Sequence, residues 1–189
     1  MKLLYLGNSI TFHEIAPEFG WYGEWGMAAT DREKDYVHTL NRMLEENGIS
    51  VKYEAHNIKA IELHPETYDL DMLSSFLHWK PDILIVRLGE NVPADQMEEF
   101  TTICSRLIEL FQKVGTKVYV SGLYYKNEMK EFYLQQLGEL PGVTFVSLKG
   151  IHSEEYQAIG QFEHPSVAAH PSDKGMKYIA KAIYDAMYL

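Results

Sequence analysis

Five short apolar runs, separated by amphipathic stretches, constrain the fold of this chain more than any other feature of its sequence. Some of these runs, such as ILIV at residues 83–86, carry apolar side chains at consecutive positions. That pattern is typical of parallel strands that are covered on both faces. We therefore predict strands within residues 3–7, 51–57, 82–89, 117–122 and 143–148.

The stretches between the runs have helical spacing. Residues 37–44 carry apolar side chains three and four positions apart, and Gly48 follows as a C-terminal cap. A further stripe at residues 176–187 begins after Ser172. Strands that alternate with helices predict a parallel sheet between two layers of helices, a three-layer α/β/α sandwich.

A third apolar stripe, at residues 100–111, follows Asp95 and ends before Gly115. Glu98 stands three residues after Asp95, which predicts a capping box at the start of this helix. The single cysteine of the chain, Cys104, lies within the stripe, so we expect it in the core and not as a nucleophile.

Composition limits the classes of function. The chain has 189 residues, which fits one domain over residues 1–189, and its net charge of −10 argues against nucleic acid and anionic membranes as partners. No apolar run approaches the ~18 residues of a membrane span, and no signal peptide is evident, so we expect a cytoplasmic protein. A single cysteine and scattered histidines lack the spacing of metal ligands, so no metal or other cofactor is expected.

The segment GNSIT, residues 7–11, lies where the first predicted strand ends. Ligands of parallel α/β sheets bind at the carboxyl ends of the strands. Ser9 could cap the following turn, as most serines at strand ends do, or it could act as a nucleophile. A serine hydroxyl needs a neighbouring base to attack, and on this segment alone both interpretations remain open.

Two later segments favour the interpretation of Ser9 as a nucleophile. His170 stands in a loop just before the last predicted helix, where its imidazole could reach the same edge of the sheet. Asn91 follows the third predicted strand at that edge, and a side-chain amide there is a natural donor to a developing oxyanion.

These three segments, in this order, resemble the SGNH or GDSL-type hydrolases. GNSIT resembles the first sequence block of that family, GEN at residues 89–91 the third, and HPSDKGM at residues 170–176 the last. The resemblance implies a flavodoxin-like α/β/α fold with a five-stranded parallel sheet, Ser9 as nucleophile, His170 as general base and Asn91 as oxyanion donor. It also implies a small ester as substrate and no cofactor.

The chain departs from the family pattern at two places. The last block of the family usually reads D-x-x-H, but Val167 stands three residues before His170. We therefore expect a Ser-His dyad, with a main-chain carbonyl or Glu163 holding the ring, and we regard Asp173 as a weaker candidate for an orienting acid. The second His-Pro pair, at His164, ranks below His170 because no long helix follows it.

The second block usually supplies a glycine N–H to the oxyanion hole, whereas this chain has NIKAIELHP at residues 57–65. Ala60 is the nearest equivalent, and its N–H can still donate.

Two further groups of residues could line the substrate pocket. Arg87, within the apolar third strand, needs a carboxylate partner, for which Glu62 and Glu90 are candidates. The ion pair could tie strand ends together, or Arg87 or Glu90 could form the floor of the pocket.

The second group is a long aromatic segment that follows GNSIT, with glycines between its aromatic residues. Its rings could bind sugars or acyl chains, or could fill a small core of their own. The residues are Trp21, Tyr22 and Trp25.

Three functions fit this sequence. The first is a serine esterase that removes a small acyl group from a carbohydrate or a similar polar alcohol. The second is a thioesterase or a lysophospholipase-like acyl hydrolase. The third is a catalytically weak member of the same family that binds a sugar ligand.

Overall fold

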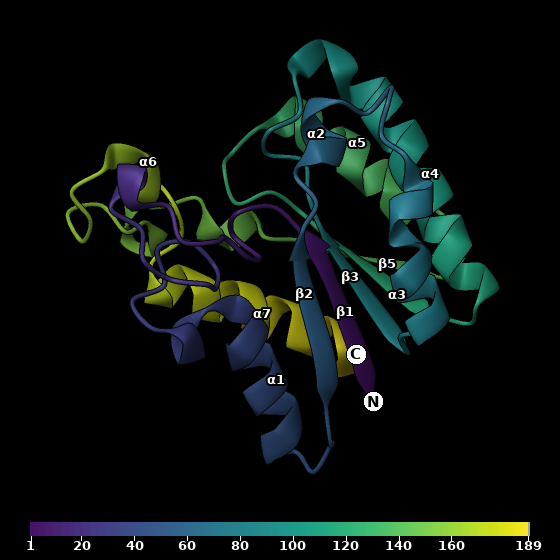
Figure 1. Ribbon diagram of the computed structural model, residues 1–189, viewed down its shortest axis with the longest axis horizontal. Coiled ribbons are helices and arrows are strands. Elements are labelled where there is room, and N and C mark those ends of the chain that lie inside the picture. The colour runs from purple at the N-terminus through teal and green to yellow at the C-terminus, as the bar shows by residue number, and fades with distance from the viewer. Residues whose placement is uncertain (189) are drawn as a thin grey trace.

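A five-stranded parallel sheet forms the centre of the molecule (Figure 1). The computed structural model describes residues 1–188; Leu189, the last residue of the expected domain, lies outside them. The strands pair in the order β2-β1-β3-β4-β5. All five predicted strands are confirmed: β1 (Lys2–Gly7), β2 (Lys52–Asn57), β3 (Ile83–Arg87), β4 (Lys117–Ser121) and β5 (Val143–Val146).

Helices cover both faces of this sheet, which confirms the predicted α/β/α sandwich (Figure 1). One face carries α1 (Tyr36–Glu46) and α7 (Asp173–Tyr188), which pack against each other. The opposite face carries α2 (Ala60–Leu63), α3 (Ser74–Trp79), α4 (Met97–Lys113) and α5 (Glu128–Gly138). The short helix α6 (Pro165–Ala168) lies away from the sheet, among the loops.

The uninterrupted apolar runs are explained by two separate cores. Leu4 and Leu6 of β1 face α4 and α5, whereas Leu3 and Tyr5 of the same strand face α1 and α7. Because successive side chains of a strand point to opposite faces, a strand between two helical layers must be apolar at every position. Cys104 lies fully buried in the first of these cores, as expected.

The ends of the helices agree with the sequence in part. Gly48 follows α1 in the left-handed conformation, with φ of +80°, as a C-terminal glycine does. The capping box predicted at Asp95 is wrong: Asp95 lies in a short 3₁₀ turn, and α4 begins at Met97 without a side-chain cap. Helix α5 was not predicted, because its apolar stripe is weak: Met129 and Phe132 are exposed.

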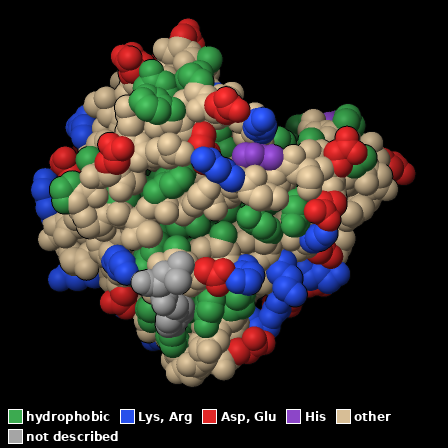
Figure 2. All heavy atoms as spheres, turned by 180° about the vertical axis from the view of Figure 1, so that it is seen from behind, with side chains coloured by type: hydrophobic (Ala, Val, Ile, Leu, Met, Phe, Trp, Pro, Cys, Tyr) green, Lys and Arg blue, Asp and Glu red, His purple; other side chains and the backbone are tan. Residues whose placement is uncertain are grey.

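The surface is mixed in character. Acidic and basic side chains lie interspersed over the face shown in Figure 2, so that face carries no large area of a single charge. Among residues 1–188, no helix combines the length and apolar character needed to cross a bilayer.

The order of the strands determines where a ligand can bind. The chain leaves β1 to form β2 on one side and later forms β3 on the other, so the loops that follow β1 and β3 diverge at the carboxyl edge. A crevice at such a switch point is where doubly wound sheets bind ligands. Ser9 follows β1 and Asn91 follows β3, so both lie at this edge.

Candidate active site

The turn that carries Ser9 is held by its own backbone. The carbonyl of Asn8 accepts hydrogen bonds from the N–H groups of Thr11, at 2.9 Å, and of Phe12, at 3.1 Å. A Cβ at Gly7 would lie 1.9 Å from Oγ1 of Thr11 and 2.8 Å from the carbonyl oxygen of Arg87, so only glycine fits there. The glycine of GNSIT thus lets the chain turn tightly against the end of β3.

Ser9 and His170 lie within hydrogen-bond distance although 161 residues separate them. Oγ of Ser9 is 2.8 Å from Nε2 of His170, and Nδ1 of the same ring is 2.7 Å from the carbonyl oxygen of Ser166. A carbonyl accepts only, so Nδ1 must carry the proton and Nε2 must present its lone pair to Ser9. This is the arrangement in which the imidazole can accept the serine proton.

The His170 ring is neutral near pH 7. The pKa of His170 is lowered to about 4, mainly by burial and also by the nearby charges of Arg87 and His13, against the opposing effects of the hydrogen bond to Ser166 and the charge of Glu90. A histidine with this pKa remains a proton acceptor over the whole neutral range.

Neither candidate acid contacts the ring of His170. Asp173 lies in the first turn of α7, where it accepts hydrogen bonds from the N–H and the hydroxyl of Thr30, at 2.8 and 2.7 Å, and pairs with Lys34 at 2.9 Å. Glu163 is an exposed residue at the rim of a surface hollow and has no hydrogen bond to the ring. The second histidine, His164, caps α6: its Nδ1 accepts the N–H of Ser166 at 3.2 Å.

The candidate oxyanion donors lie on three segments. Within residues 1–188, the backbone N–H groups of Ser9 and Ala60 make no hydrogen bond, so both are available to a ligand. The side chain of Asn91 is already engaged: its Nδ2 donates to Oε2 of Glu62 at 2.7 Å. We expected this amide to point toward Ser9, and one of its two N–H bonds points to Glu62 instead.

A buried polar cluster lies beneath this edge of the sheet. Arg87, fully buried, pairs with Glu90, whose Oε1 is 2.6 Å from Nη2 of Arg87. Glu62 is not the partner of Arg87, because its oxygens face Gly89 and Asn91. Arg87 and Glu62 are both 0% exposed, so neither lines the surface of a pocket, which favours the alternative that Arg87 ties strand ends together through an ion pair.

Burial and charge act differently on the two carboxyl groups. Burial and the nearby charge of Glu90 raise the pKa of Glu62, against hydrogen bonds from Asn91, Gly89 and Asn8. Burial also acts to raise the pKa of Glu90, but the guanidinium of Arg87 and hydrogen bonds from Tyr124 and Asn8 outweigh it and lower the pKa.

The part that Asn8 has in this cluster could not be inferred from the sequence. Its side chain, 1% exposed, donates to Glu62 at 3.2 Å and to Glu90 at 2.8 Å, and accepts from Arg87 at 3.3 Å. The only available signal was its place beside Ser9, since its partners come from segments 54 to 82 residues away.

The aromatic segment packs on itself and on Phe162 and Val167 to form a small core. Trp21 is 3% exposed and meets Trp25 edge to face, with ring centroids 5.6 Å apart, while Nε1 of Trp25 donates to the carbonyl of Ala29 at 2.9 Å. Of the three expected ligand-binding aromatic residues, only Tyr22 is largely exposed, at 71%. The structure therefore shows the small self-packed core that we considered as the alternative.

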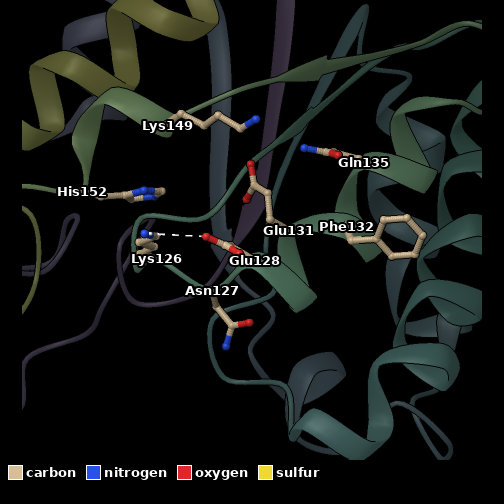
Figure 3. Close-up of a pocket in the computed structure, with 8 residues that line it drawn as sticks. All are labelled: Lys126, Asn127, Glu128, Glu131, Phe132, Gln135, Lys149 and His152. Carbon is tan, nitrogen blue, oxygen red and sulfur yellow. Dashed lines mark ion pairs between the residues drawn. The ribbon is translucent and has the colours of Figure 1, made fainter.

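Several hollows lie around this edge of the sheet. One of about 330 Å³ is lined by residues that follow β1, among them His13, and by the end of β2, including Asn57. A larger one of about 620 Å³ lies beyond β4 and β5, and Figure 3 shows the side chain of Glu131 pointing into it from α5. Ser9 and His170 line neither hollow.

Comparison with known proteins yields matches in structure alone. No protein-family model matches the sequence, and a search of curated proteins finds no match. Among solved structures, the chain is similar to the psychrotrophic esterase EstA from Pseudoalteromonas sp., with a TM-score of 0.67 and 15% identity over 99% of this chain and 96% of that one.

Two further solved structures are similar over nearly their whole length. An acetyl xylan esterase, AlAXEase, has a TM-score of 0.63 and 16% identity over 98% of this chain and 99% of that one. A putative GDSL-like lipase from Parabacteroides merdae has a TM-score of 0.62 and 14% identity, with 99% and 95% covered. From its sheet order and these likenesses, the chain has the fold of the SGNH/GDSL hydrolases.

Proposed function

We propose that this protein is a serine esterase that cleaves small esters by a Ser9–His170 dyad. The observation that carries the proposal is the 2.8 Å contact between Oγ of Ser9 and Nε2 of His170, together with the carbonyl that fixes the tautomer of the ring. A nucleophile within reach of a base that is itself oriented by a third group is the arrangement expected of nucleophilic catalysis.

In the first half of the reaction, Oγ of Ser9 attacks the ester carbonyl carbon while its proton passes to Nε2 of His170. The carbonyl oxygen becomes an oxyanion, which the N–H groups of Ser9 and Ala60 and the free amide N–H of Asn91 would stabilise. His170 then returns the proton to the oxygen of the leaving alcohol, so the C–O bond breaks and the acyl group stays on Ser9.

In the second half, water replaces the alcohol. His170 takes a proton from the water as its oxygen attacks the acyl carbon, and a second oxyanion forms in the same position. The bond to Ser9 breaks, the proton goes back to Oγ, and a carboxylic acid leaves. The carbonyl of Ser166 keeps the ring oriented during both halves but, having no charge, stabilises the imidazolium less than a carboxylate would.

The substrate we propose is a small acyl group on a carbohydrate or a similar polar alcohol. The likeness to a protein described as an acetyl xylan esterase supports this class.

Covalent labelling tests the proposal. A fluorophosphonate probe should label the wild-type protein, and Ser9→Ala should abolish the label without changing the melting temperature. An aryl acetate and an acetylated oligosaccharide, assayed in parallel with an acyl thioester, then identify the substrate class. A folded wild-type protein that takes up no label and hydrolyses none of these substrates would favour a binding protein.

A further inference from the structure

We propose that Glu62 is a positioning residue, which holds the side-chain amide of Asn91 with its N–H group toward the reacting carbonyl oxygen. The inference rests on the proposed function, because it assigns how the oxyanion donor of that reaction is oriented. Glu62 itself is 0% exposed and touches no substrate.

One carboxylate connects the three segments that carry the oxyanion donors. Glu62 belongs to α2, two residues after Ala60. Its Oε1 lies 2.5 Å from the N–H nitrogen of Gly89 and 3.2 Å from Nδ2 of Asn8, the neighbour of Ser9, and its Oε2 lies 2.7 Å from Nδ2 of Asn91. The positions of all three donors relative to one another therefore depend on this side chain.

The chemistry of a carboxylate determines which way the Asn91 amide points. An ionised carboxylate accepts hydrogen bonds and donates none, so the NH₂ end of the amide must face Glu62 and the C=O end must face away. One N–H of Nδ2 is used by this contact. The second N–H, about 120° away in the plane of the amide, makes no hydrogen bond among residues 1–188 and is free for a ligand.

Without this contact the amide would lose its orientation. Asn91 is an exposed residue, and nothing else among residues 1–188 bonds to its side chain. A free amide can turn by 180° and present its oxygen where the donor should be, and an oxygen lone pair repels the oxyanion. The position of a donor before the reaction begins is what makes it effective.

The substitution Glu62→Gln should reverse the amide of Asn91. The N–H of Gly89 requires an acceptor at Oε1, so the new NH₂ group must take the place of Oε2 and face Asn91. Asn91 must then turn its own oxygen toward it. We expect kcat to fall about 10- to 100-fold with KM changed less than about threefold, as for loss of an interaction that is made only in the transition state.

Glu131→Gln is the matched control. Glu131 is also a buried glutamate, 8% exposed, whose Oε2 accepts a backbone N–H, that of Leu123, at 2.9 Å. It lies on α5 at the hollow beyond β4 and β5 (Figure 3) and has no part in the proposed reaction. The same chemical change there should alter the melting temperature but leave kcat within about twofold of wild type.

A double-mutant cycle separates positioning from a general structural effect. Asn91→Ala should lower kcat by about 10²-fold, and adding Glu62→Gln to it should lower kcat by less than a further threefold, because the amide that Glu62 orients is gone. If Glu62→Gln does not fold, Glu62→Asp replaces it in the cycle, since the shorter carboxylate cannot reach both Gly89 and Asn91.

The outcomes distinguish this inference from the proposed function. A wild-type protein that is active and labelled, with a Glu62 variant of equal kcat, would overturn the positioning role alone. Losses that multiply in the double mutant would overturn it as well, because Glu62 would then act independently of Asn91. A wild-type protein without label or esterase activity would overturn the proposed function and this inference together.

Discussion

The low pKa of His170 predicts an esterase whose activity persists in acid. The proposed reaction needs a neutral ring, and burial lowers the pKa of His170 from 6.5 to about 4. Because the protonated ring cannot accept the Ser9 proton, kcat/KM should fall only as the pH drops through about 4 and should stay flat above it.

The size of the effect follows from the two pKa values. At pH 5.5 a group with a pKa of 4 is about 97% neutral, whereas one with a pKa of 6.5 is about 9% neutral. The ratio of kcat/KM at pH 5.5 to that at pH 7.5 should therefore be about 1 for this site, against about 0.1 for an ordinary histidine.

A stopped assay with an aryl acetate, at constant ionic strength from pH 3.5 to 8, measures this ratio. Glu62→Gln serves as the control: its residual activity should show the same acid limb, since the titrating Glu62 carboxyl is gone and His170 remains. Circular dichroism at each pH excludes unfolding as the cause of the limb. A limb centred near pH 6.5 in a folded protein would refute the argument, because the base would then be solvated.

Two further predictions concern residues near the site. Val167→Asp, which creates the D-x-x-H pattern of the family, should lower the melting temperature and should not raise kcat. Val167 is 0% exposed and packs in an apolar cluster with Trp21, so a carboxylate there would be buried without a partner. A stable variant with higher kcat would contradict this. Trp21→Ala should lower the free energy of unfolding, measured by urea denaturation, by about 3–5 kcal/mol. Tyr22 is 71% exposed, so Tyr22→Ala should lower it by less than about 0.5 kcal/mol. Equal losses would show that the aromatic segment is not a core.

The sheet and its two main helical layers could be predicted because their signals are local. An apolar run of four residues between amphipathic stretches has few alternatives to a buried parallel strand. Helix α5 could not be predicted because its local signal is weak. Its buried side chains, Leu134 and Leu137, share a short helix with exposed Met129 and Phe132. Its place is decided by contact with α4, β4 and β5, and not by its own pattern.

Only some contacts of the candidate site could be predicted from the sequence. The sequence indicated that the side chains of Ser9 and His170 would lie close together, since both residues were predicted at the carboxyl edge of the sheet. It could not choose between Glu62 and Glu90 as partners of Arg87, because reach across strand ends depends on the path of the backbone. Nor could it indicate the partners of Asn8, which come from two other segments, α2 and the end of β3.

The main-chain acceptor at Ser166 has a consequence for how such proteins are found. Every residue has a backbone carbonyl, so an acceptor of this kind does not depend on the residue type. Ser166 could be replaced by Ala or Thr, and the His170 ring would keep its hydrogen-bond acceptor. A pattern search that demands an acid before the histidine passes over any chain built in this way. Such chains are found by their other motifs, such as GNSIT and GEN here, or by comparison of their structures.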